Sequence, residues 1–402
     1  MKHSKLNFSN IIISLFFFGI LFGSFFLTMV LPDRKVSVIE NRSLATKPVL
    51  TGESFKSGKY FDEYETYHSD QYPLRNKMLE INGIFKYKMI DQKIAEIGPK
   101  KYYRSNNGFI IQQNSNQNPT TLVNEVKGLT SELSKKNIPV FYSIIPHKSV
   151  FFETELPTYL PSYGKESVKK LRDGLETVPS LHLVDVEKEL RKQPKEEIYF
   201  KTDHHWNTNG AFIGYQKIVS ELNKTLPEIG EPISKDTFKF EKKGLAFNGS
   251  YARSTTLSFV TESDQMIVPT NDIISPTVKA CIDKDNKCDD PVFFPEKLTE
   301  VNPYTDRFVY FGLNQALIRY KNSDPISQKK LVILKDSYAK PIIPFLTKHF
   351  KEVDVLDTRY FGEDANFKNS SAVKFIEEEK PDAVIFITNT TAVEKNITEY
   401  IQ

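Results

Sequence analysis

Short apolar runs and amphipathic stretches alternate along most of this 402-residue chain. The apolar runs predict strands buried on both faces, and the amphipathic stretches repeat with the period of a helix. The predicted strands are Gly108–Ile111, Val140–Ile145, His182–Val186, Phe308–Phe311, Leu331–Leu334, Val353–Leu356 and Ala383–Ile387. The predicted helices are Thr120–Lys136, Lys165–Leu175, Glu187–Arg191, Gly210–Leu222 with Thr208 as its N-cap, Pro341–Phe350 and Ser371–Glu379. This alternation predicts an α/β fold in which helices cover both faces of a mostly parallel sheet.

Two segments interrupt the alternation. Tyr60–Ile97 has apolar positions near the helical period, interrupted at Pro73, and predicts helices. Residues 235–305 are rich in Ser, Thr, Asp and Pro, and predict an insertion of short strands and loops. We therefore expect a stalk and helical segment over residues 32–100, followed by one α/β domain over residues 101–402 that carries the insertion.

The N-terminal region has a different pattern. Ile11–Val30 is an uncharged, almost wholly apolar run, and about twenty such residues span a bilayer. Lys2 and Lys5 precede the run and favour a cytoplasmic N-terminus, although Arg34 and Lys35 follow it and make the charge difference small. Because no small-x-small cleavage motif follows, an uncleaved signal anchor is favoured, and a cleaved signal peptide is the alternative.

The expected topology places residues 1–9 in the cytoplasm, a transmembrane segment at residues 10–31 and the rest of the chain outside. We therefore expect a single-pass protein of the cell membrane with an extracytoplasmic domain. Cys281 and Cys288 fit this location, because they lie across a polar turn and could close a small disulfide loop there. The acidic residues around them suggest a calcium loop as an alternative, but they lack the Gly and the closing Glu of an EF-hand, so a calcium site is not favoured.

Composition excludes one class of partner. The chain has 54 basic and 51 acidic residues, a net charge of +3, and no basic tract interleaved with aromatic residues. Nucleic acid is therefore not expected as a ligand. The 30 Phe and 19 Tyr residues are explained most simply by core packing, and stacking on sugar rings is the functional alternative.

The segment Thr202–Trp206 carries the strongest chemical signal. Asp203 lies two residues before His205, and a carboxylate there can fix the tautomer of an imidazole that acts as general base. Adjacent residues on an extended loop point in opposite directions, so the spacing selects His205 and leaves His204 for packing or hydrogen bonding. Two alternatives remain, a structural Asp–His pair and a zinc site with His147 as a further ligand. We expect no catalytic metal, because the spacings of typical zinc motifs are missing.

A candidate nucleophile lies further along the chain. The strand Leu331–Leu334 runs into Asp336 and Ser337. Pro341 then opens a helical stretch. A Ser at a sharp strand-to-helix turn lies beside backbone N–H groups that can stabilise an oxyanion. Parallel strands place functional groups at their carboxyl ends, which is where we expect Ser337 to meet His205. The alternative is a Ser that only caps the helix.

Four further residues are candidates for contacting the substrate or an oxyanion. They are Trp206, which directly follows His205, Arg359 and Tyr360, which follow the strand ending at Leu356, and Asn389, which follows the strand ending at Ile387. An amide can donate to an oxyanion, and a guanidinium can bind substrate oxygens. The ordinary alternatives are a solvated loop residue for Asn389 and a surface ion pair for Arg359.

The motif residues resemble a known family. Thr202–Trp206 resembles the motif of DHHW-type proteins, which are similar to the alginate O-acetyltransferases of the SGNH hydrolase superfamily. Glu40–Ala45, Gly58–Glu65 and Asp70–Arg75 resemble the segments that lead into the same domain. The likeness runs from about Glu40 to the C-terminus, and the insertion is covered least. The Asp-His-His-Trp string is fairly specific, whereas the Asp-Ser pair is not.

This resemblance implies an SGNH-like three-layer fold and a serine acyl-transfer site with Asp203, His205 and Ser337 as its triad. It also implies that the Asp-x-His block precedes the serine, the reverse of the common SGNH order, as it does here. The family nucleophile follows Gly-Asp, whereas this chain has Lys335 in the Gly position. We expect no cofactor. Acetyl transfer outside the cytoplasm implies a polysaccharide acceptor and a polytopic membrane protein that supplies acetyl groups.

The leading hypothesis is a membrane-anchored O-acetyltransferase or acetylesterase that acts on an extracellular polysaccharide through an acyl-enzyme. A non-catalytic assembly or sugar-binding component of a surface-polymer export machine fits the single anchor and the aromatic content equally well. A teichoic-acid D-alanyl transfer protein shares the anchor and a related fold. A poised general base favours catalysis, because a binding protein does not need one.

Overall fold

The computed structural model describes residues 8–37, 42–269, 277–282, 288–302, 305–361 and 371–391. It divides into two compact units, residues 1–92 with 252–259 and residues 93–251 with 260–402, which are described separately. The α-helices are α1 Phe8–Val30, α2 Gly52–Lys56, α3 Lys59–Gln71, α4 Arg75–Gly83, α5 Thr120–Ser134, α6 Lys148–Phe151, α7 Gly164–Glu176, α8 Val186–Leu190, α9 Lys195–Ile198, α10 Thr208–Asn223, α11 Ser250–Thr255, α12 Ile343–Leu346 and α13 Ala372–Glu379.

The other elements in the described residues are β-strands, 3-10 helices and a π-helix. The strands are β1 Val36–Ser37, β2 Arg42–Ser43, β3 Ile94–Ile97, β4 Lys100–Arg104, β5 Ile110–Gln112, β6 Val140–Ile145, β7 Leu181–Asp185, β8 Phe240–Phe247, β9 Asp264–Pro269, β10 Val278–Ile282, β11 Leu317–Asn322, β12 Lys330–Lys335, β13 Glu352–Asp357 and β14 Ala383–Asn389. The 3-10 helices are η2 Glu153–Glu155, η3 Pro227–Ile229, η4 Lys235–Thr237, η5 Leu257–Phe259, η6 Pro295–Leu298, η7 Arg307–Phe311 and η8 Ser337–Ala339, and η1 Ile84–Met89 is a π-helix.

The first unit is helical. Its helix α1 covers the apolar run and is long and apolar enough to cross a bilayer. The helices α3, α4 and η1 follow where the 3.6-residue pattern predicts them, with Pro73 between α3 and α4. The predicted helical stretch Tyr60–Ile97 was wrong at its end, because Ile94–Ile97 forms the strand β3, which belongs to the second unit.

The second unit is built on a seven-stranded sheet in the order β10-β11-β13-β12-β14-β6-β7. The five strands from β13 to β7 run parallel to their neighbours, and β10 and β11 form an antiparallel edge. The mostly parallel α/β sheet that the sequence predicts is confirmed. Because parallel strands end together, the residues after β6, β12 and β14 meet at one edge.

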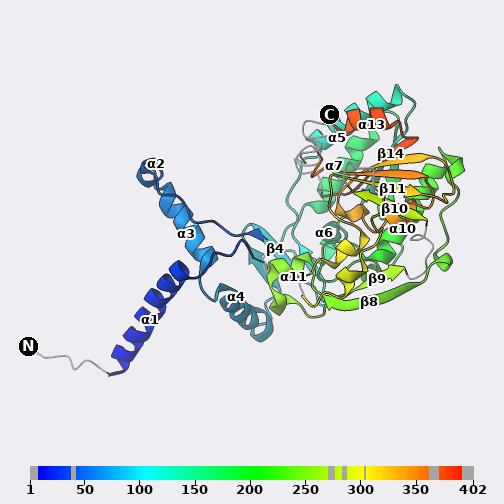
Figure 1. The fold of residues 1–402 in the computed structure, drawn as a ribbon. Helices are drawn as coiled ribbons and strands as arrows, with labels where there is room; N and C mark the ends of the chain where they lie inside the picture. The colour runs from blue at the N-terminus through cyan, green and yellow to red at the C-terminus, as the bar shows by residue number, and fades with distance from the viewer. Residues whose placement is uncertain are drawn as a thin grey trace, which may run out of the picture. The chain divides into compact units, whose positions relative to one another are not determined.

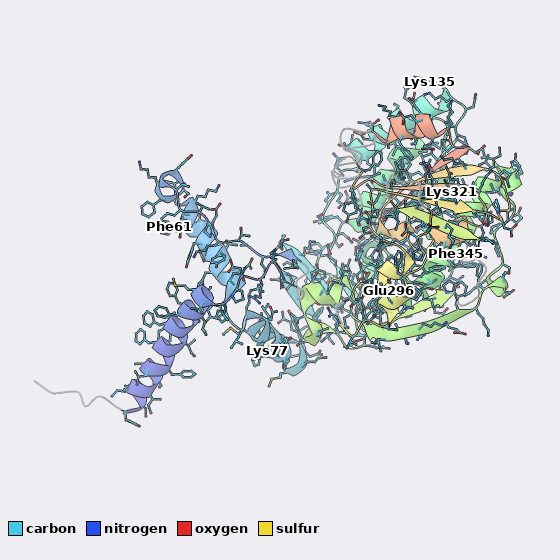
Figure 2. The ribbon with its side chains drawn as sticks, in the orientation of Figure 1. Phe61, Lys77, Lys135, Glu296, Lys321 and Phe345 are labelled. Atoms are coloured by element: carbon cyan, nitrogen blue, oxygen red, sulfur yellow. A yellow bond between two sulfur atoms is a disulfide. The ribbon has the colours of Figure 1, made fainter. Side chains whose placement is uncertain are left out.

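Two buried apolar clusters show that helices cover both faces of this sheet (Figure 1). On one face, Leu129 of α5 and Ile376 of α13 pack with Val332 of β12. On the other face, Phe345 of α12, which is labelled in Figure 2, lies against Phe212 of α10, with ring centroids 5.1 Å apart. The alternating burial of successive strand residues onto these two clusters produces the three layers.

At the edge of the sheet, one predicted strand was wrong and two strands of the sheet were not predicted. The stretch Phe308–Phe311 lies in the 3-10 helix η7 and not in a strand, because Asp306 caps its first turn and Gly312 ends it at φ +125°. The antiparallel strand β11 was not predicted, and β10, which was assigned to the insertion, joins the main sheet.

Two helix boundaries also differ from the prediction. The predicted helix Pro341–Phe350 is reduced to the single turn α12. The N-cap of α10 is Asn207 and not Thr208, since the Asn207 side chain accepts from Asn209 N and Gly210 N.

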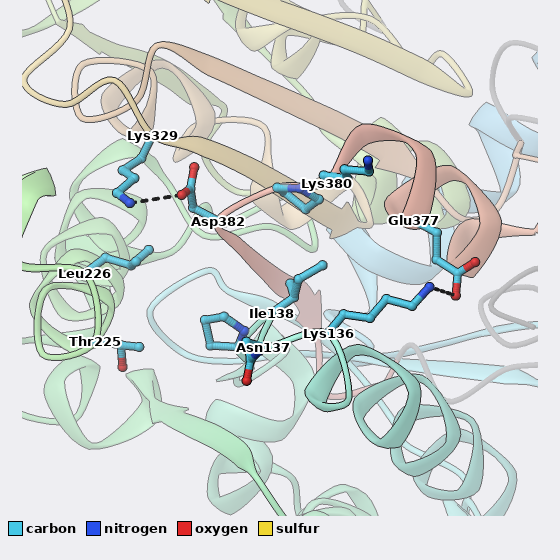
Figure 3. A pocket seen from close by; sticks show the side chains of 11 residues that line it. Lys136, Asn137, Ile138, Thr225, Leu226, Lys329, Glu377, Lys380 and Asp382 are labelled. Atoms are coloured by element: carbon cyan, nitrogen blue, oxygen red, sulfur yellow. Dashed lines mark hydrogen bonds and ion pairs between the residues drawn. The ribbon is translucent and has the colours of Figure 1, made fainter.

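Two further features belong to this unit. Cys281 and Cys288 form a disulfide at the carboxyl end of the edge strand β10. A cavity of about 570 Å³ lies at the amino ends of the parallel strands, where residues that precede β6, β12 and β14 line it (Figure 3). The ion pairs Lys136–Glu377 and Lys329–Asp382 lie on its wall.

Candidate active site

The loop between α9 and α10 is closed by backbone hydrogen bonds at its base. Tyr199 and Trp206 form an antiparallel bridge, and Phe200 N donates to His205 O at 3.3 Å. Asn207 N donates to Ile198 O at 2.9 Å. The six residues between Tyr199 and Trp206 therefore form a tight turn that fixes where Asp203 and His205 point.

Two buried charged side chains hold this turn from outside. Lys148 Nζ donates to Lys201 O at 2.7 Å and to Asp203 O at 2.8 Å. The carboxylate of Asp264 accepts from Lys201 N and from Thr202 N, both at 2.7 Å. Burial lowers the pKa of Lys148 to about 7, and the nearby carboxylates of Asp264 and Asp203 oppose that shift. Neither residue could be predicted from the sequence as a contact of this turn, because nothing local marks the contact of either with residues so distant in the chain.

Ser337, His205 and Asp203 form a continuous hydrogen-bonded chain. His205 Nε2 lies 2.8 Å from Ser337 Oγ, and His205 Nδ1 lies 2.6 Å from Asp203 Oδ1. A carboxylate only accepts, so Nδ1 carries the proton and Nε2 is left to accept from the serine hydroxyl. The structure thus brings together the three residues that the sequence selected, in the geometry that a nucleophile, a base and an orienting acid require.

The carboxylate of Asp203 is held ionised. Burial opposes its charge, but His204 and His205 and the hydrogen bond from Ser250 N keep its pKa well below the usual range. The same burial, together with His205, keeps the pKa of His204 well below its usual value. Burial and His205 likewise lower the pKa of His147 to about 3. Burial therefore disfavours a positive charge on His204 and on His147.

Both faces of the His205 ring are covered. The ring of Phe308 stacks on it with centroids 4.0 Å apart at 14°, and the ring of His204 lies 3.7 Å away on a tilt of 37°. These contacts shield the imidazole from water and limit its rotation. Phe308 was missed in the sequence because its segment had been assigned to a strand, whereas η7 presents it to the site.

Ser337 begins a short 3-10 turn directly after β12 and is half-buried. The Asp336 side chain fixes this turn by accepting from Tyr338 N at 2.8 Å, from Asn389 N at 2.9 Å and from Asn389 Nδ2 at 2.6 Å. Asn389 therefore binds the turn that carries Ser337 to the end of β14. The sequence suggests Asn389 as an oxyanion donor, but its side-chain amide donates to Asp336 Oδ2.

Lys335, which stands where the related motif has Gly, forms a buried ion pair. Its Nζ lies 2.6 Å from Asp357 Oδ2 at the end of the neighbouring strand β13. Arg359 forms a two-point contact with the same carboxylate, at 2.8 and 2.6 Å. Arg359 is therefore engaged in an ion pair, and the half-exposed Tyr360 ring packs under its guanidinium at 5.3 Å.

A turn from the predicted insertion supports Asp203. Gly249 N donates to Thr202 Oγ1 at 2.9 Å, and Ser250 N donates to Asp203 Oδ2 at 2.7 Å. A Cβ atom on Gly249 would lie 2.4 Å from Asp203 Oδ2, so only glycine permits this approach. Ser250 Oγ also hydrogen-bonds His204 Nδ1 at 2.5 Å.

The sequence suggests Trp206 as a substrate contact, and the structure corrects this expectation. Its side chain is fully buried, and its Nε1 donates to Tyr338 O at 3.0 Å. The hydroxyl of Tyr338 in turn accepts from Lys148 N at 3.1 Å and donates to His204 O. Trp206 and Tyr338 therefore join the turn that carries His205 to the turn that carries Ser337.

Two acidic or histidine clusters in the described residues have ligand atoms close enough to hold a metal. In the cluster Asp203, His204 and His205, the hydrogen bonds above already use the carboxylate and the Nδ1 atom of each ring. In the other, formed by Glu352, Asp354 and Glu379, Lys330 and Arg319 occupy the centre as counter-ions. In both clusters, hydrogen bonds or ion pairs already engage most of the atoms that could bind a metal.

Comparisons with known proteins agree with this architecture. Residues 102–278 match the family model of the SGNH hydrolase-like domain of acetyltransferase AlgX. The chain is 18% identical over 179 residues to the probable alginate O-acetylase AlgJ of Pseudomonas syringae pv. tomato. That match covers 44% of this chain and 46% of the relative, so the chain matches less than half of the relative's length.

Solved structures show the same fold. Bacillus cereus PatB1 with a sulfonyl adduct has a TM-score of 0.61 at 18% identity, covering 77% of this chain and 100% of that chain. A DHHW family protein from Eubacterium siraeum has a TM-score of 0.60 at 19% identity, covering 77% and 96%. The resemblance to DHHW proteins and to SGNH hydrolase-like acetyltransferase domains is confirmed, and the fold is SGNH-like.

Proposed function

We propose that this protein is a membrane-anchored serine O-acetyltransferase that acetylates hydroxyl groups of a polysaccharide outside the cytoplasm. The observation that carries the proposal is the hydrogen-bonded chain from Asp203 through His205 to Ser337, with distances of 2.6 and 2.8 Å. The match of residues 102–278 to an acetyltransferase domain supports the same reaction class.

The first half-reaction forms the acyl-enzyme. Ser337 Oγ attacks the carbonyl carbon of an acetyl ester while its proton passes to His205 Nε2, and the negative Asp203 stabilises the imidazolium that results. The tetrahedral intermediate collapses when the bond to the donor oxygen breaks and His205 returns its proton to that oxygen. Ser337 then carries the acetyl group as an ester.

The second half-reaction repeats these steps with a sugar hydroxyl. Its oxygen attacks the acetyl carbon and gives its proton to His205, and Ser337 Oγ leaves and takes that proton back. Water in place of the sugar would give acetate, which is the esterase reaction. The rings of Phe308 and His204 cover the faces of the base, and the choice between transfer and hydrolysis depends on which hydroxyl reaches His205 Nε2 beside Ser337.

Location and partners follow from α1 and from the chemistry of the donor. A single-pass anchor at residues 8–30 would hold the domain at the outer face of the membrane, near an exported polymer. Activated acetyl groups are made in the cytoplasm, so a polytopic membrane protein would have to deliver them across the bilayer. The alginate O-acetylase named among the relatives makes an exported polysaccharide the favoured acceptor.

Acetyl transfer to oligosaccharides tests the proposal. The full chain would be incubated with p-nitrophenyl acetate and a panel of oligosaccharides, and acetylated oligosaccharides would be identified by mass spectrometry. Transfer should be lost in Ser337→Ala and unchanged in the control Ser131→Ala, an exposed serine on α5. Undiminished transfer in Ser337→Ala would contradict the nucleophile, and release of acetate alone with every acceptor would favour an acetylesterase.

A further inference from the structure

One face of the helix formed by α4 and η1 is apolar and exposed. Leu74, just before the helix, and four residues along it are each more than half exposed: Met78, Ile81, Phe85 and Met89. Their spacings of four, three, four and four residues place all five side chains in one stripe. The wider π-helical turn of η1 keeps Phe85 and Met89 in line with the residues before them.

The opposite face of the same helix is fixed within the first unit. Tyr87 is buried, and its ring packs edge-on against Phe259 with centroids 4.7 Å apart. A Cβ atom on Gly83 would lie 2.8 Å from Thr256 Oγ1, so the helix packs closely there. Because this face is occupied, the apolar stripe has to point away from the body of the unit.

Basic residues border the stripe on both sides. Lys77 and Lys88 flank it on one side, and Arg75 and Lys86 flank it on the other. Glu80 is the single acidic residue between positions 75 and 89, so this segment carries a net charge of 4 − 1 = +3. Lys77, labelled in Figure 2, extends from α4. An apolar stripe between basic borders is the pattern of a helix that lies in the interface of an anionic membrane.

The start of this helix is tied to the end of α1. Tyr67 Oη donates to Asp33 Oδ1 at 2.8 Å, and Arg34 Nη2 donates to Asp70 O at 2.6 Å. Gln71 and Arg34 exchange two further hydrogen bonds at 3.0 Å through the Gln71 amide. The end of α3, and with it the turn into α4, therefore lies beside the residues that leave α1.

One ring contact indicates how close to the membrane the contact between α1 and the end of α3 would lie. The ring of His68 on α3 lies 6.2 Å from that of Phe25, which is inside α1 and not beyond its end. If α1 spans the bilayer, the end of α3 and the start of α4 lie at the level of the lipid headgroups. A lipid surface is then the nearest apolar phase for the stripe.

We infer that the apolar stripe of α4 and η1 inserts into the outer leaflet of the membrane that α1 spans, with anionic headgroups around its basic borders. The inference depends on α1 spanning the membrane and is independent of the chemistry at Ser337. It gives the chain a second attachment that would limit its motion around a single anchor helix.

Depth-dependent fluorescence quenching tests this inference on the full chain. The two native cysteines are joined in a disulfide, so a single added cysteine can be labelled selectively. The variant Phe85→Cys would carry an environment-sensitive fluorophore in phosphatidylglycerol-containing proteoliposomes, with nitroxide lipids as quenchers. Ile13→Cys in α1 is the positive control, and Lys169→Cys on the exposed face of α7 is the negative control.

The expected quenching of the Phe85 probe is within about twofold of the α1 probe and about tenfold above the Lys169 probe. Adding Met78→Glu and Ile81→Glu should lower the Phe85 signal and leave the α1 signal unchanged. Quenching in α1 with none at Phe85 would overturn the inference. Shielding of the Phe85 probe by a second copy or by a membrane protein, without lipid quenching, would also overturn it and assign the stripe to a protein contact.

Discussion

Replacing Asp203 by Asn separates the two tasks of its carboxylate. One oxygen accepts both from His205 N at 2.9 Å and from His205 Nδ1 at 2.6 Å. The other accepts from Ser250 N at 2.7 Å. An amide keeps one acceptor and replaces the other by a donor, so it must sacrifice one of these two sides.

The structure predicts which side is lost. With its NH₂ group toward His205, the amide would face two donors, and with its NH₂ group toward Ser250 it would face one. Each buried donor left without an acceptor costs about 1–3 kcal/mol, so the amide oxygen should stay on His205. The Nδ1–H tautomer of His205 would then survive, and the substitution would remove mainly the negative charge.

The expected loss of activity follows from that charge. At an effective dielectric constant of about 20, a unit charge about 4 Å from the imidazolium contributes about 4 kcal/mol. This corresponds to about 10³-fold in kcat/KM, below the roughly 10⁴-fold loss that accompanies a wrong tautomer in a serine triad. Hydrolysis of p-nitrophenyl acetate would measure the rate, and ¹⁵N NMR of labelled histidine would read the tautomer.

Two results would refute this reasoning. A rate within about threefold of wild type would show that Asp203 does not assist His205. A spectrum with the proton on Nε2 of His205 would show that the amide had turned the other way. The His205 signals can be assigned among the seven histidines by comparison with His205→Gln.

Three further predictions concern the surroundings of the site. Phe308→Leu should lower kcat about 2–10-fold, since stacked aromatic pairs contribute about 0.5–1.5 kcal/mol, whereas Phe308→Tyr should keep most of the activity; equal rates in both would argue against a role for the stack on His205. Lys148 has a pKa of about 7 in the folded chain against about 10.4 when unfolded, so the folded state binds fewer protons between these two pH values. The free energy of unfolding should therefore rise with pH across that window, relative to the variant Lys148→Met. If the free energies of unfolding of the two proteins, measured with urea, changed in parallel from pH 7 to about 10, the shift would be contradicted. Incubation with EDTA should leave esterase activity intact, because hydrogen bonds already occupy both carboxylate oxygens of Asp203 and the Nδ1 atom of His204; a loss that zinc restores would revive the metal site.

The sequence predicted those parts of the site that depend on short spacing. Asp203 and His205 lie two positions apart, and their pairing follows from the turn itself. Ser337 could be found because an apolar strand precedes it, and parallel strands bring their carboxyl ends to one edge. Each of these inferences needs only a few consecutive residues.

The residues that position the catalytic side chains could not be predicted from the sequence, because their partners are distant in the chain. The ammonium group of Lys148 contacts carbonyl oxygens more than fifty positions away, and Lys335 is buried only because Asp357 ends the neighbouring strand. Phe308 was misassigned because an apolar run of aromatic residues fits a strand or a buried 3-10 turn equally well. β11 was missed because Arg319 and Lys321 alternate with buried residues, as on a half-solvated edge strand.

Mass spectrometry of the intact chain during turnover tests the central claim most directly. Rapid acid quenching after mixing with p-nitrophenyl acetate should trap one added acetyl group, and peptide mapping should locate it on Ser337. His205→Gln should abolish this adduct, since Ser337 Oγ would lose the base 2.8 Å away. An adduct on any other residue, or full turnover by Ser337→Ala, would contradict the account.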